Sequence, residues 1–120
     1  QNKLGDDGVV LLVDSSNLFN LTSLDLSRNN IGDVGAIAIA TSPYLSKLKK
    51  LDLYDNKITA KGIKALIQSK TLTNLQQLDF VKNDIDDESA AKLWESHMNS
   101  CRALKKIGTS QEGRLPLCLN

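Results

Sequence analysis

The sequence predicts an α/β solenoid, a right-handed superhelix with about four parallel strands on a concave face and helices on a convex face. Three observations predict it. A short apolar motif recurs at a constant period, a stretch with helical spacing follows each copy, and the chain has 20 leucines against 5 valines. Ordinary strands favour β-branched residues. A leucine-rich chain with a fixed period therefore indicates stacked units, in which each core position touches its copy in the next unit.

The repeat is visible in three segments that align without a gap. They read LTSLDLSRNNI at 21–31, LKKLDLYDNKI at 48–58 and LQQLDFVKNDI at 75–85. The asparagines of the three segments are 27 residues apart, at Asn29, Asn56 and Asn83.

This period predicts a single domain over 1–120. It divides the domain into a partial repeat at 1–17, repeats at 18–44, 45–71 and 72–100, and a degenerate unit at 101–120. The last unit is degenerate because Glu112 stands where the asparagine belongs. The segment 2–8 matches 29–35, so we expect the chain to open within a repeat as a fragment of a longer protein.

The pattern L-x-x-L-x-L-x-x-N-x-I followed by a helix resembles the leucine-rich repeat family, whose period is about 20 to 29 residues. The long period and the glycines Gly35 and Gly62 resemble the ribonuclease-inhibitor-like subclass. Phe80 and Ser89 depart from the pattern, where a leucine and a glycine are expected. The resemblance implies an inhibitor, a sensor domain or an adaptor surface, and fold alone does not choose among them.

The alternation within each L-x-L segment predicts a short strand. Side chains of a strand point alternately to its two faces, so Leu24, Leu51 and Leu78 are expected to point into one core. A fourth parallel strand is expected around Leu104 and Ile107.

The asparagines follow the strands, where the chain turns inward and its backbone groups lose their sheet partners. An asparagine side chain carries both a donor and an acceptor, and buried polar groups need such partners. We therefore interpret Asn29, Asn56 and Asn83 as a structural asparagine ladder.

Four equivalent residues precede the helical stretches, and all are acceptable N-caps: Gly5, Gly32, Thr59 and Asp86. Acidic residues in the first turn complement the positive end of a helix dipole, and Asp6, Asp33 and Asp87 stand there.

Two sets of helical residues are expected to face the core: Val9, Ala36, Ile63 and Ala90, then Leu12, Ile39, Leu66 and Leu93. The opposite face is expected to be polar. The apolar run at 9–13 also fits a buried strand of a nucleotide-binding fold. No glycine-rich phosphate loop follows it, and the repeat register places it on a helix beside 36–40.

The near-zero net charge and the short apolar runs argue against nucleic-acid and membrane partners. The chain has 15 basic and 14 acidic residues, whereas nucleic acids and anionic membranes select a strongly basic face. The longest apolar run is far shorter than the roughly 20 residues of a membrane-spanning helix. We therefore expect no nucleic-acid partner and no membrane partner.

Cys101 and Cys118 are too few for a disulfide framework or a metal-ligand pattern. We expect reduced thiols and a cytoplasmic location. The one histidine, His97, has no partner at a spacing typical of a catalytic site. The sequence predicts no cofactor, no metal and no enzymatic activity.

Outward positions of the strands form rows across the concave face, and one row consists of Asp25, Asp52 and Asp79. Adjacent carboxylates repel, so this row fits a basic partner, although neighbouring cations offset its charge. Tyrosine is enriched at interface centres, which favours Tyr54. The candidate partner-binding residues are Asp25, Arg28, Lys50, Asp52, Tyr54, Gln77, Asp79 and Val81.

The sequence therefore predicts a protein–protein interaction module that binds a protein partner through its concave face. One alternative is a regulator of a small GTPase built on the same repeats, acting through an inserted arginine or asparagine. Another is a structural segment that self-associates through uncapped ends, because an open sheet edge invites association. The apolar tail at 115–120 is expected to fold over the last strand.

Overall fold

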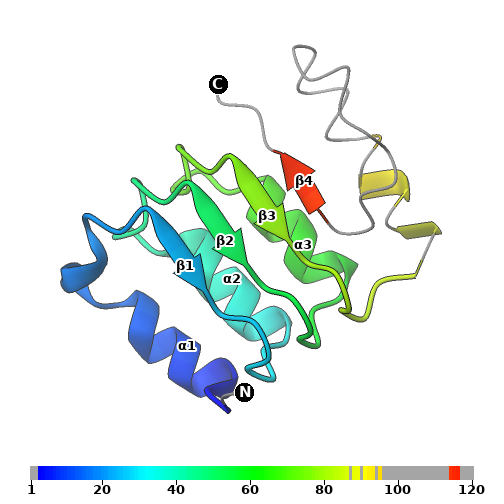
Figure 1. The fold of residues 1–120 in the computed structure, drawn as a ribbon, viewed down its shortest axis with the longest axis horizontal. Coiled ribbons are helices and arrows are strands. Elements are labelled where there is room, and N and C mark those ends of the chain that lie inside the picture. The colour runs from blue at the N-terminus through cyan, green and yellow to red at the C-terminus, as the bar shows by residue number, and fades with distance from the viewer. Residues whose placement is uncertain (1–2, 87, 90, 94, 96–113, 117–120) are drawn as a thin grey trace.

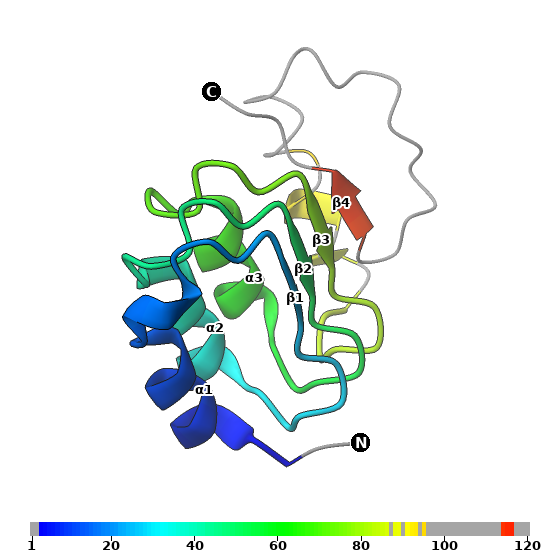
Figure 2. The same ribbon diagram turned by 60° about the vertical axis from the view of Figure 1, so that its left-hand side comes forward.

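The computed structural model describes residues 3–86, 88–89, 91–93, 95 and 114–116. The strands lie side by side in one layer, and the helices form a second layer behind them (Figure 1, Figure 2). In chain order the elements are α1 (Gly5–Val13), the 3-10 helix η1 (Ser16–Leu18), β1 (Ser23–Asp25), α2 (Asp33–Thr41), β2 (Lys50–Asp52), α3 (Ala60–Ile67), β3 (Gln77–Asp79) and β4 (Arg114–Pro116).

The sheet has the order β1-β2-β3-β4, and its first three strands are parallel. Leu24 lies opposite Leu51, and Leu51 lies opposite Leu78. This is the register that the 27-residue period predicts, since each position lies beside its own copy in the next unit.

The fourth strand differs from the expected one. β4 pairs antiparallel with β3, so the prediction of four parallel strands is wrong for this element. An antiparallel strand satisfies the edge of β3 without the helical crossover that a parallel strand needs. The start of the tail thus pairs with β3, the third strand, and residues 117–120 of the tail lie outside the described residues. The segment around Leu104 and Ile107, where a parallel strand was expected, lies outside the described residues.

The core lies between the sheet and the helices. Leu51 and Leu78 of the sheet are 2% and 1% exposed, and Ile39 and Ile63 of the helices are fully buried. Among the other helix positions predicted to face the core, Val9, Ala36 and Leu66 are buried, Leu12 and Leu93 are half-buried, and Ala90 lies outside the described residues.

The helices begin largely where the sequence predicts. Residues 9–13 lie in α1, which confirms the helical interpretation against the buried strand. Gly32 and Thr59 are the N-caps of α2 and α3. The Asp86 carboxylate accepts a hydrogen bond from the Ser89 N–H at 2.6 Å, as the side chain of an N-cap does.

The start of α1 is an exception. Gly5 is the first residue of this helix rather than its N-cap, which is Leu4. The φ angle of Gly5 is 66°, a left-handed conformation that glycine adopts without steric cost. Its N–H donates to the Asn29 carbonyl at 2.8 Å. This bond ties the start of the helix to the neighbouring unit, which is why the prediction fails here.

The outer face of the helix layer is less polar than predicted. Leu11 and Val10 of α1 are 77% and 41% exposed, and Val34 of α2 is 62% exposed. The equivalents of Leu11 in the next two units are Ala38 and Ala65, which pack partly against the core. The apolar exposure is therefore greatest at the N-terminal end of the stack.

An aspartate of one helix caps the next helix. The Asp33 carboxylate accepts hydrogen bonds from the N–H groups of Thr59 at 2.8 Å and Gly62 at 3.2 Å. Asp6 accepts from the N–H groups of Gly32 and Gly35 at 2.8 and 3.0 Å. The first-turn aspartates therefore join neighbouring units, a role beyond the predicted complement to their own helix dipole.

This contact explains the repeated glycine. A Cβ at Gly62 would lie 2.6 Å from Asp33 Oδ1 and 2.5 Å from a methyl carbon of Ile58, both too close for real atoms. A Cβ at Gly35 would meet the Asp6 carboxylate at 2.7 Å. Glycine is needed because the carboxylate and an apolar side chain already fill that space.

The next pair of neighbouring units changes both residues of this contact together. Ala60 stands where Asp6 and Asp33 stand in the earlier units, and Ser89 stands where the glycine stands. Alanine offers no carboxylate to crowd a side chain at 89 or to cap the following turn. Asp86 supplies that cap from within its own unit.

We expect Asp33→Ala to lower the free energy of unfolding by about 1–2 kcal/mol, because the N–H and the hydroxyl of Thr59 lose their acceptor and the Gly62 N–H keeps only the Thr59 carbonyl. Gly62→Ala should cost about 1–3 kcal/mol through overpacking. The double variant should lose less than the sum, since removing the carboxylate relieves part of the clash. Urea denaturation of the four proteins measures this coupling.

Asp7→Ala is the matched control, because Asp7 is an exposed acid in the first turn of α1. It should change stability by less than about 0.5 kcal/mol. Additive losses in the Asp33 and Gly62 variants would show that the two residues do not share a contact.

Candidate functional site

The open face of the sheet, defined as the side away from the helices, carries the outward side chains of β1, β2 and β3. Strand pairing aligns Ser23, Lys50 and Gln77 in one row and Asp25, Asp52 and Asp79 in the next. Ser27, Tyr54 and Val81 follow the strands at equivalent positions. All the predicted partner-binding residues except Arg28 therefore lie in three rows, and Arg28 stands next to Ser27.

The asparagine side chains fix the ends of these rows. Asn56 is 6% exposed, and its carbonyl oxygen accepts from the N–H groups of Asn29 and Ile31, both at 3.0 Å. Its amide donates to the carbonyls of Leu26 and Leu53, also at 3.0 Å. One buried side chain thus bonds the turns of two successive units.

Asn83 repeats this arrangement one unit later. Its oxygen accepts from the Ile58 N–H at 2.9 Å, and its amide donates to the Leu53 and Phe80 carbonyls at 2.8 and 3.0 Å. Asn29 accepts from the Leu4 N–H at 3.3 Å and donates to the Ser27 carbonyl at 3.0 Å. The side-chain bonds of all three asparagines to another unit reach the unit before their own.

The residue before each asparagine has a left-handed backbone. Arg28, Asp55 and Lys82 have φ angles of 57°, 56° and 59°. This conformation is uncommon for residues with a side chain and costs about 1–3 kcal/mol each. The asparagine bonds hold the turn in place, so three charged side chains stand at equivalent positions beside the open face.

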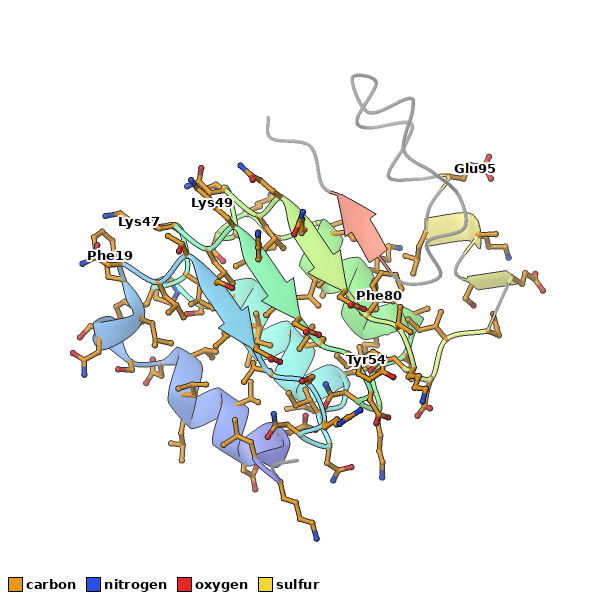
Figure 3. The ribbon with its side chains drawn as sticks, viewed as in Figure 1. Phe19, Lys47, Lys49, Tyr54, Phe80 and Glu95 are labelled. Atoms are coloured by element: carbon orange, nitrogen blue, oxygen red, sulfur yellow. The ribbon has the colours of Figure 1, made fainter. Side chains whose placement is uncertain are left out.

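Tyr54 is the centre of a charged cluster at this end of the sheet. The Arg28 guanidinium carbon and the Lys82 ammonium nitrogen lie 5.6 and 5.7 Å from the centroid of its ring. Arg28 also pairs with Asp55 at 3.7 Å. Figure 3 shows Tyr54 just past the strand ends. We call Arg28, Tyr54, Asp55 and Lys82 the tyrosine cluster.

The aspartate row bonds to its own backbone. Asp25, Asp52 and Asp79 each accept a hydrogen bond from the N–H two residues later, at 2.9, 2.9 and 3.0 Å. The hydrogen bond from the Ser27 backbone lowers the pKa of Asp25, because it favours the charged carboxylate. These carboxylates therefore stabilise the turn that follows each strand.

Sequence reasoning found Arg28 and Tyr54 separately but not the cluster around them. Asp55 and Lys82, which the structure places in this cluster, are not among the predicted partner-binding residues, although their place before the asparagines is a usable signal. His97, Cys101 and Cys118 lie outside the described residues. Within the described part of the chain, no group of three His, Cys, Asp or Glu side chains is arranged to hold a metal ion. No helix there has the length and apolar character to cross a membrane.

A family model for the leucine-rich repeat matches residues 17–40, 44–66 and 71–93, which is more than half of the chain. No curated protein matches it. The matched segments contain β1, β2 and β3, the three ladder asparagines and all but the last residue of α2 and of α3. Repeats of this kind generally serve as protein–protein interaction modules. The chain belongs to the leucine-rich repeat family.

Proposed function

We propose that the chain is a protein-binding module whose open sheet face holds a protein partner, with the tyrosine cluster as the centre of the contact. The observation that carries this proposal is the pair of cations held against the half-buried Tyr54. The 27-residue period and the positions of Gly35 and Gly62 support a ribonuclease-inhibitor-like subclass.

The cluster has the properties of a binding anchor. Tyrosine and arginine are enriched among residues that dominate interface energies. The side chains of Arg28 and Asp55 are 55% and 50% exposed, so the cluster is accessible to a partner. Its backbone is fixed by the asparagine ladder, so little conformational entropy is lost on binding.

In this proposal the aspartate row has a structural role and supports the turns beside the tyrosine cluster. One oxygen of each carboxylate already accepts a backbone N–H. The row alone predicts a basic partner. The cations of such a partner would compete with the backbone N–H groups for the carboxylates that stabilise the turns. We therefore assign the binding energy to the tyrosine cluster, with Val81 and Gln77 as flanking contacts.

We expect Tyr54→Ala to weaken binding of face-directed ligands at least about ten-fold, the loss typical of an interface anchor. The measurement selects peptides from a random library on the whole chain and then determines their affinities for the variant. Loss of the ring also frees Arg28 and Lys82, so the anchor and its flanking cations are tested together.

Tyr44→Ala is the matched control, because Tyr44 is the only other tyrosine and stands outside the three rows. It should change these affinities less than two-fold. Peptides that shift the amides around Tyr54 in NMR spectra, and that bind equally well to wild type and Tyr54→Ala, would contradict the proposal.

A second surface favours self-association. Leu24, Leu12 and Leu18 are half-buried at the N-terminal end of the stack, whereas their equivalents one unit later are fully or nearly fully buried. Within the described elements β1 pairs only with β2. We propose that two copies of the chain meet through this end, here called the α1–β1 end.

Leu11→Asp should raise the concentration needed for dimerisation at least ten-fold, because it places a charge on the most exposed apolar residue of this end. Sedimentation velocity over a concentration series measures the shift. Val34→Asp is the control on the outer face of α2 and should leave the dimer intact. A wild-type chain that stays monomeric throughout the series would contradict this proposal.

A further inference from the structure

The two ends of the strands differ in charge. The segments 15–24, 42–51 and 69–78, which lead into the strands, contain four lysines and no acidic residue. Asp14 precedes these segments, and the aspartate row follows them. Figure 3 shows Phe19, Lys47 and Lys49 together near the starts of β1 and β2, away from Tyr54. The near-neutral total of the chain conceals this local positive charge.

Lys47 is held against an exposed aromatic ring. Its ammonium nitrogen lies 4.6 Å from the centroid of the Phe19 ring and donates to the Asn20 side-chain oxygen at 2.9 Å. Phe19 is 49% exposed. The ring and the ammonium therefore present an apolar surface and a positive charge side by side from two successive units.

Lys49 and Lys50 project from a fixed backbone. Their N–H groups both donate to the Thr22 carbonyl, at 2.8 and 3.1 Å. The Lys49 carbonyl accepts from the N–H groups of Gln76 and Gln77, at 2.8 and 3.0 Å. Hydrogen bonds to both neighbouring units thus fix the backbone of two exposed lysines that closely follow Lys47 in the chain. We call Phe19, Lys47, Lys49 and Lys50 the basic edge.

The positive charge of the basic edge has no carboxylate partner within the described residues, since none of its three ammonium groups lies within 4.0 Å of one. Opposite charges attract, so an anionic segment that meets several of these lysines at once gains favourable ion pairs. We propose that the basic edge binds an acidic segment of a protein partner, whose carboxylates meet the lysines while an apolar side chain packs on Phe19.

The chemistry favours a short acidic peptide over a nucleic acid. Arginine is the preferred residue for phosphate recognition, and the basic edge has none. A nucleic acid continues its dense charge along its length and would meet the aspartate row two residues further along each strand. A short acidic segment can pair with the lysines and end before it reaches the aspartate row. The inference concerns the opposite end of the strands from the tyrosine cluster and stands without it.

The test is an NMR titration of the whole ¹⁵N-labelled chain with a capped hexaglutamate peptide at low salt. Hexaglutamine is the neutral control, and a single-stranded oligothymidine of equal charge is the nucleic-acid control. We expect saturable shifts at the amides of residues 17–23 and 45–50 with hexaglutamate, and none with hexaglutamine. This mapping needs no variant, so it does not depend on the folding of one.

The variant Lys47→Gln/Lys49→Gln/Lys50→Gln should bind hexaglutamate about ten-fold more weakly, because three exposed ion pairs are lost. The matched control is Lys57→Gln/Lys61→Gln/Lys64→Gln, which removes the same charge from exposed lysines elsewhere. It should change the affinity less than two-fold.

Equal losses in the two triple variants would overturn the inference, because they would indicate attraction by net charge alone. Shifts that map elsewhere, or tighter binding of oligothymidine at the same residues, would overturn it as well. Loss of peptide ligands in Tyr54→Ala would leave it unchanged, so this inference and the proposed function fail separately.

Discussion

The structure depends on hydrogen bonds that each unit makes to its neighbour at the end of the strand. The Asn56 side chain accepts two N–H groups of the preceding unit and donates to carbonyls of both units. A buried backbone group without a partner costs about 1–3 kcal/mol. An asparagine of the following unit therefore stabilises the turn before it, which explains why the asparagine recurs at the same place in three successive units.

The ends of the helices also depend on hydrogen bonds from a neighbouring unit. Asp33 caps the start of the following helix, and the Ser69 hydroxyl donates to the Ala40 carbonyl at the end of the preceding one. Ser42 makes the equivalent bond to the Val13 carbonyl. Side-chain hydrogen bonds thus join neighbouring units at three places: the end of the strand, the start of the helix and the end of the helix. These bonds explain how strands of three residues stay aligned.

Much of the fold follows from the sequence because each core position occurs at the same place in three units. Two copies of Leu-x-Leu and one of Leu-x-Phe determine which residues point inward, and the strand register agrees with them. Gly5 did not follow the prediction because its N–H donates to the Asn29 carbonyl of the neighbouring unit. Val10 and Val34 did not follow it because single exposed apolar residues are common on protein surfaces. The antiparallel pairing of β4 was not predictable, since the last unit lacks the repeat pattern that carries the information.

The site was harder to predict because contacts between units leave no local signature. Arg28 and Tyr54 each carried a signal, but the cluster arises from the left-handed turn that places Arg28, Asp55 and Lys82 beside the same face. Likewise, Lys47 and Phe19 are 28 residues apart and meet only after stacking. Ala60 and Ser89 replace the pair Asp33 and Gly62 one unit later. The link between these two changes is recognised only when the helices are known to be neighbours.

The central claim is that side-chain bonds between units hold the stack in register. Amide hydrogen exchange of Asn56→Ala, compared with Asn74→Ala, tests it most directly, because the Asn74 side chain makes a single exposed bond to Ser46. The account predicts that Asn56→Ala removes protection at residues 29 and 31 and lowers the free energy of unfolding by about 2–4 kcal/mol. Asn74→Ala should cost less than about 1 kcal/mol. Equal protection patterns in the two variants would contradict the account.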